Sequence, residues 1–147
     1  MTVSKKLKRL CLVSFSALYG GGLAYWLSRL FLRHAGSFGE EQHWLEKSAG
    51  PFHLVAAVTF IFVTGIIWAR HAEYAVKLGK HRFSGWVFFA VLAFMLVTGV
   101  TQLYGNEYWI HRAEQLHPWF GVALLPILAI HWLKKKRIAR HSRGWRI

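Results

Sequence analysis

The chain has 147 residues, a formal net charge of +13 and 54% hydrophobic residues. This apolar content combined with a strong charge excess is atypical of a soluble globular protein, and the length fits one domain. The single cysteine, Cys11, excludes an intrachain disulfide, an iron–sulfur cluster built from this chain alone and a covalent Cys-x-x-Cys-His haem site.

Four stretches of the chain contain no Lys, Arg, Asp or Glu: residues 10–28, 48–69, 83–106 and 115–133. Each approaches the roughly 20 residues that a helix needs to cross about 30 Å of hydrocarbon. The pattern predicts an all-α integral membrane four-helix bundle that forms a single domain over residues 1–147. We expect helices at about 8–33, 50–71, 82–105 and 114–134, followed by a basic tail at 134–147.

Basic residues are distributed unevenly between the two predicted sides of the membrane. With the N-terminus in the cytoplasm, 15 Lys and Arg lie on the cytoplasmic side and four on the other side, namely Arg29, Arg33, Lys47 and Arg112. By the positive-inside rule this predicts cytoplasmic N- and C-termini. Because the basic residues flank apolar spans, we expect contact with membrane lipid and not with nucleic acid. The tail is interpreted as an anchor on anionic lipid, with a partner-docking arm as the alternative.

Two of the predicted spans carry a histidine near each end. His53 begins the second span and His71 ends it, whereas His117 begins the fourth span and His131 ends it. These spans run in the same direction, so His53 matches His117 in depth near the outer face, and His71 matches His131 near the inner face. At 3.6 residues per turn, each helix presents its two imidazoles on one stripe, about 27 Å apart in the second span and about 21 Å in the fourth.

Two facing stripes of this kind form two bis-imidazole sites, which is the ligand set of haem b held without covalent attachment. We therefore expect two haem b groups, with His53 and His117 as outer ligands and His71 and His131 as inner ligands. His81, in a basic stretch at the start of the third span, is the alternative inner ligand. The remaining histidines are interpreted as interfacial residues: His34, His43, His111 and His141.

A flat macrocycle needs space between helices and cations near its propionates. Gly65, Gly99 and Gly121 are candidates for the space, although glycines also serve helix packing alone in membranes. Candidate propionate partners lie at both faces. They are Arg112 and Lys47 outside, and Arg70, Lys77, Lys80, Arg82 and Lys134 inside.

Several segments resemble a bacterial family of small four-helix membrane di-haem cytochromes b, relatives of the cytochrome b subunits of hydrogenases and formate dehydrogenases. The resemblance covers about residues 38–132 and is carried by FGEEQHWLEKSAGPFH (38–53), the Arg70–His71 exit from the second span, HRFSGW (81–86), VTGVTQLYGNE (97–107) and HPWFGVALLPILAIHW (117–132). It implies that His53, His71, His117 and His131 are the haem ligands. It also implies that Ser84 and Gly85 form a small-residue turn beside the inner haem.

These features predict electron transfer across the membrane between a quinone pool or cytoplasmic-side donor and a periplasmic or membrane redox protein. The loops are too short for a catalytic domain, so we expect a subunit of a larger complex and not an independent enzyme. Quinone is a candidate second cofactor, although no residue singles out a pocket for it. A cofactor-free structural subunit is the alternative, and metal uptake through His34, His43 and His53 is a third, less favoured one.

Overall fold

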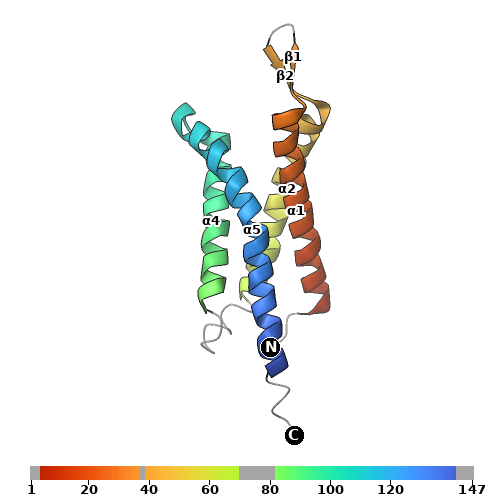
Figure 1. Ribbon diagram of the computed structural model, residues 1–147, viewed down its shortest axis with the longest axis vertical. Coiled ribbons are helices and arrows are strands. Elements are labelled where there is room, and N and C mark those ends of the chain that lie inside the picture. Colours follow the sequence, from red (N-terminus) through yellow and green to blue (C-terminus); the bar gives the residue numbers. More distant parts are fainter. Residues whose placement is uncertain (1–3, 37–38, 70–81, 142–147) are drawn as a thin grey trace. The chain divides into compact units, whose positions relative to one another are not determined.

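The computed structural model describes residues 4–36, 39–69 and 82–141, except the side chains of residues 82, 84 and 131–141. The elements in these ranges, in chain order, are α1 (Lys5–Phe31), β1 (His34–Gly36), β2 (Gly39–Glu41), α2 (Trp44–Ile67), α4 (Arg82–Tyr104) and α5 (Glu107–His141) (Figure 1). The chain divides into two compact units, Met1–Gly79 and Lys80–Ile147, and each is described by itself.

All four helices are long and apolar enough to cross a membrane. Large apolar side chains are exposed along them, among them Val55 at 65%, Phe62 at 70% and Val97 at 62%. Such a surface is unfavourable in water and suits a hydrocarbon environment. The prediction of four helices long and apolar enough to span a membrane is therefore confirmed, and the described fold is mostly helical, with a small sheet added.

In the first unit, α1 and α2 form an antiparallel helical hairpin. The rings of Phe15 and Phe60 pack with centroids 5.6 Å apart. Further along, the ring of Tyr25 lies 3.3 Å from the point where a Cβ on Gly50 would stand. Because residue numbers rise along α1 as they fall along α2, the two helices run in opposite directions. Phe15 and Phe60 are both buried and belong to the core of this hairpin.

A short β-hairpin connects the two helices, and sequence analysis did not predict it. β1 pairs antiparallel with β2 through His34 with Glu41, Ala35 with Glu40, and Gly36 with Gly39. Gly39 has φ 122°, a conformation that favours glycine. Strands of three residues are too short to produce a recognisable alternation of apolar and polar side chains, which explains why the pattern gave no signal.

Helix α2 begins at Trp44, earlier than the expected start near residue 50. His43 caps the helix, since its Nδ1 accepts a hydrogen bond from the Leu45 amide at 3.2 Å. Glu46 lies inside the helix, although the expected start was placed after the last charged residue before the apolar stretch, and Pro51 lies inside the helix as well. His53 consequently lies nine residues after the first residue of α2 and not at the start of the helix.

The second unit is also an antiparallel helical hairpin, formed by α4 and α5. The rings of Phe94 and Phe120 lie 4.4 Å apart between the two helices. Asn106 caps α5 by accepting hydrogen bonds from the Trp109 amide on its side chain at 3.1 Å and from the Ile110 amide on its carbonyl at 2.9 Å. Helix α5 thus begins at Glu107, before the expected residue 114, and continues to His141, beyond the expected end at 134.

Candidate functional site

His53 packs directly against the backbone of α1. Its Nδ1 lies 2.9 Å from the carbonyl oxygen of Leu18. A carbonyl can only accept a hydrogen bond, so Nδ1 carries the proton and donates it. In a neutral imidazole of this tautomer, Nε2 has the lone pair that a metal ligand requires. The contact between the two helices thus fixes both the orientation and the tautomer of the ring.

Two glycines of α1 allow this close approach. A Cβ on Gly22 would stand 2.8 Å from Cε1 and 3.0 Å from Nδ1 of His53. A Cβ on Gly21 would stand 2.8 Å from Cδ1 of Phe52. Side chains essentially never approach so closely, so residues larger than glycine here would displace the ring from α1. The run of three glycines at 20–22 is the sequence signal for this contact, and sequence analysis did not use it.

His117 has a comparable environment in the second hairpin. Its Nδ1 lies 2.8 Å from the hydroxyl of Thr98, which is buried on α4. The same hydroxyl lies 3.0 Å from the Phe94 carbonyl and 3.1 Å from the Met95 carbonyl. The hydroxyl has one proton, and when it donates that proton to the helix carbonyls it accepts the Nδ1 proton of His117. In that arrangement the lone pair of His117 lies on Nε2.

The two hairpins therefore repeat one arrangement. In each, a histidine of the second helix hydrogen-bonds through Nδ1 to an oxygen on the first helix. Each ring also lies near a glycine, but the approach differs: a Cβ on Gly22 would stand 2.8 Å from Cε1 of His53, whereas a Cβ on Gly99 would stand at an ordinary contact distance of 3.5 Å from Cε1 of His117. A histidine that ligates a metal through Nε2 usually donates a hydrogen bond from Nδ1 to a neighbouring oxygen. Both predicted outer ligands thus have the donor chemistry that an axial imidazole needs.

The predicted inner site falls largely outside the described part of the chain. His71 and the alternative ligand His81 lie outside the described residues, as do the predicted propionate partners Arg70, Lys77 and Lys80. His131 lies within α5, and Arg82 and Ser84 lie in the first turn of α4, but their side chains are outside the described part as well. Because α5 is continuous from His117 to His131, these two residues are separated by about 21 Å of helical rise.

The other predicted outer residues have identifiable surroundings. The exposed guanidinium of Arg112 lies 5.6 Å from the centre of the Tyr108 ring, a cation–π contact. Gly121 faces α4, where a Cβ would stand 3.4 Å from Cε of Met95. Gly121 thus serves packing between α4 and α5 within this hairpin. A Cβ on Gly65 would meet nothing within 4 Å, so the surface at this glycine is open.

A buried ion pair at the β-hairpin end of the first helical hairpin was missed by sequence analysis. Glu46 is 2% exposed, and both its carboxylate oxygens accept from Arg33, with Nε of Arg33 3.0 Å from Oε2. Arg33 also reaches Glu40 on β2 at 3.4 Å, and Arg29 lies 3.8 Å from Glu46. The hydrogen bonds from Arg33 to Glu46 raise the pKa of Arg33 further above its usual value. One guanidinium thus links α1, α2 and the β-hairpin.

Metal uptake by a histidine cluster receives no support from the described residues. His43 uses its Nδ1 to cap α2, and His34 lies 3.6 Å from Glu41 across the β-hairpin. Among residues 4–36, 39–69 and 82–141, no group of three or more His, Cys, Asp or Glu side chains is placed to hold a metal ion. A bis-histidine haem site involves only two side chains and is not addressed by this finding.

Comparison with protein-family models gives no matching family. Comparisons with curated proteins and with solved structures also give no match. The residues of the chain itself therefore have to carry any assignment of function.

Substitution of Gly22 by Ala tests the packing of His53 on α1. The new Cβ would stand 2.8 Å from the ring, so we expect the hairpin to lose about 1–3 kcal/mol of stability. Gly20→Ala is the matched control, because nothing lies within 4 Å of a Cβ at that position. Thermal unfolding in detergent, followed by circular dichroism, should show a lower Tm for Gly22→Ala alone. Equal Tm values for the two variants would contradict the contact.

Proposed function

We propose that this chain is a membrane di-haem cytochrome b that carries electrons across the bilayer. The observation that supports this most directly is the shared state of His53 and His117, each with Nδ1 engaged by an oxygen of its own hairpin and Nε2 assigned as the basic nitrogen. Structural histidines need only one satisfied hydrogen bond. Both histidines direct Nδ1 to an oxygen of the neighbouring helix, and this arrangement in both hairpins supports their proposal as axial ligands.

A haem b with two axial imidazoles supplies reversible one-electron chemistry and leaves no open coordination position for oxygen. The Leu18 carbonyl and the Thr98 hydroxyl hold the two rings in fixed orientations. Hydrogen bonds at Nδ1 also increase the basicity of Nε2, which strengthens a histidine as a ligand. Arg112 and Lys47 are exposed at the corresponding ends of their helices and are the candidate outer partners for propionates.

For the inner haem we propose His71 and His131 as axial ligands, with His81 as the alternative to His71. Resemblance to the four-helix di-haem cytochromes b supports this choice, together with the spacing of His117 and His131 on one continuous helix. Arg82 is the candidate propionate partner, and Ser84 is the candidate small residue beside the macrocycle. Gly121 is the candidate for space beside the outer haem, because it lies four residues after His117 on α5, about one helical turn away.

The uneven distribution of basic residues supports placing both termini in the cytoplasm. The resemblance to bacterial cytochromes b supports placing the protein in a bacterial inner membrane. The electron donor would be a quinone pool or a cytoplasmic-side protein, and the acceptor a periplasmic or membrane redox protein. The four spanning helices and short connections support a role as one subunit of a larger membrane complex. In that role the chain contributes the position and potential of the haems, and substrate chemistry takes place on its partners.

Purification from cells supplied with a haem precursor tests the proposal. We expect a red protein with a b-type α band in the reduced-minus-oxidised spectrum. Haem extraction into acidified organic solvent should be complete, because no Cys-x-x-Cys-His sequence is present for covalent attachment. Quantification should give about two haems per chain. A folded but colourless protein would contradict the proposal and favour a cofactor-free structural subunit.

A further inference from the structure

The first two turns of α1 carry a concentration of positive charge. Ser4 caps the helix by accepting from the Leu7 amide at 3.2 Å, and four exposed basic residues follow: Lys5, Lys6, Lys8 and Arg9. Helix α1 contains no acidic residue, and α2 contains none beyond Glu46. Among the described residues of this unit, the ion pairs with Glu46, Glu40 and Glu41 all lie near the other end of the hairpin. No described carboxylate of this hairpin therefore neutralises the basic end of α1.

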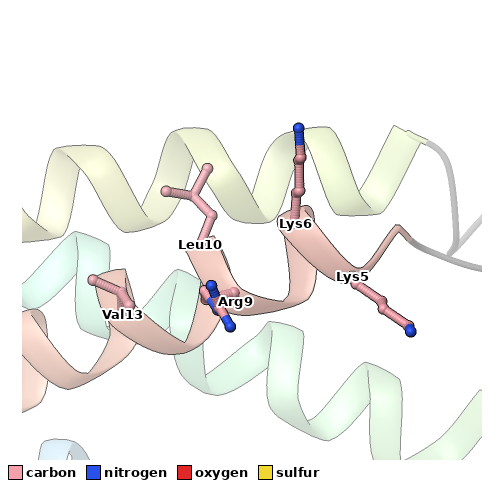
Figure 2. A pocket seen from close by; sticks show the side chains of 5 residues that line it. All are labelled: Lys5, Lys6, Arg9, Leu10 and Val13. Atoms are coloured by element: carbon pink, nitrogen blue, oxygen red, sulfur yellow. The ribbon is translucent and has the colours of Figure 1, made fainter.

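Two adjoining pockets lie at this end of the helix. The first has a volume of about 440 Å³ and is lined by Lys5, Lys6, Arg9, Leu10 and Val13 (Figure 2). The second has a volume of about 460 Å³ and is lined by Ser4, Lys6, Leu7, Leu10 and Ile66, so it extends from α1 to α2. Lys6 and Leu10 belong to both pockets and project from the same side of α1 in Figure 2. Lys8 lines neither pocket.

The lining of both pockets changes from cationic to apolar along the helix axis. Leu10 and Val13 lie about 6 Å and about 10 Å further along α1 than Lys6, in the direction of the membrane-spanning segment. Both are exposed, at 47% and 60%. A ligand that matches this order has a negative group at one end and a hydrocarbon chain at the other. Free phosphate would use only the cationic half and leave the apolar half without a partner.

We propose that these pockets bind an anionic phospholipid of the surrounding membrane. The headgroup phosphate binds Lys5, Lys6 and Arg9, and an acyl chain packs along Leu10 and Val13 or along Leu7 and Ile66. Basic clusters at the ends of membrane helices attract anionic lipid through charge, and the pockets give this attraction a defined position. None of the residues that line these pockets is a proposed haem ligand, so the proposal does not rest on the proposed function.

Comparison of Lys6→Gln with Lys8→Gln tests the site, since the two variants lose the same charge two residues apart. The full-length protein is purified in detergent micelles that contain equal amounts of phosphatidylglycerol and phosphatidylcholine, and retained lipids are counted by native mass spectrometry. We expect the unmodified chain to retain phosphatidylglycerol preferentially. Lys6→Gln should lower that retention about fivefold, which corresponds to about 1 kcal/mol for one basic residue in contact with the headgroup. Lys8→Gln should lower it less than twofold, because Lys8 lines neither pocket.

Three results would overturn the proposal. Equal losses in the two variants would show a diffuse attraction without a defined pocket. Equal retention of the two lipids by the unmodified chain would show that the headgroup charge is not recognised. Displacement of the lipid by millimolar inorganic phosphate would identify a phosphate site instead. Because Lys6 and Lys8 are both exposed, unchanged thermal unfolding of both variants serves as the check on folding.

Discussion

His53→Gln and His117→Gln are each expected to remove one haem per chain and to leave the second haem in place. Glutamine at position 53 has a side-chain amide of similar reach that can donate to the Leu18 carbonyl after a change of rotamer, while the imidazole is lost. The expected reason for haem loss is therefore the missing ligand and not a disturbed fold. Haem per chain, from the absorbance of the extracted pyridine complex, should fall from about two to about one in both variants.

The double variant His53→Gln/His117→Gln makes the test of pairing sharper. If the two histidines ligate the same haem, the double variant should also retain one haem, because the second substitution removes nothing further. Loss of both haems in the double variant would show that the residues belong to different sites and would contradict the pairing. His111→Gln is the matched control, since this exposed histidine lies in the first turns of α5 and hydrogen-bonds to Gln115 at 3.1 Å. It should retain both haems.

The four spanning helices could be predicted from the sequence because a membrane imposes one simple requirement. A helix that crosses hydrocarbon needs about 20 residues without unpaired charge, and this is visible in the distribution of Lys, Arg and Glu alone. The same criterion failed at the helix starts. A charged residue is kept out of hydrocarbon but can still belong to a helix. For this reason α2 includes Glu46, and α5 includes Glu107 and Glu114. Caps at His43 and Asn106 set these starts instead.

The candidate ligands could be selected from spacing, but their chemical state could not. Helical periodicity identifies residues that share a face, whereas a tautomer depends on a partner in another helix. Leu18 is 35 residues from His53 and contributes only its carbonyl, a group that every residue has. No side-chain pattern therefore identifies Leu18 as the partner of His53. The glycines at 21 and 22 were a usable signal, since adjacent glycines in a spanning helix favour close approach by a neighbour.

Arg33→Ala is expected to destabilise the first hairpin by about 3 kcal/mol. The substitution removes both hydrogen bonds from Arg33 to Glu46 and leaves a carboxylate whose side chain is 1% exposed. An unpaired buried charge is costly, and Arg29 at 3.8 Å compensates only in part. Thermal unfolding in detergent should show a clearly lower Tm at neutral pH. Acidification should recover part of the loss, because a protonated Glu46 no longer buries a charge.

A double-mutant cycle separates the ion pair from the general packing of this region. Glu46→Gln keeps the shape of the side chain without its charge, so adding it to Arg33→Ala should restore part of the lost stability. A double variant that is less stable than Arg33→Ala would show that the charge of Glu46 is not the cause. Arg33 lies two residues after the end of α1, and its ion pair with Glu46 joins that end of α1 to the first turn of α2. We therefore expect Arg33→Ala also to weaken retention of the outer haem, through displacement of His53 from the Leu18 carbonyl, whereas a haem bound by His71 and His131 should be retained.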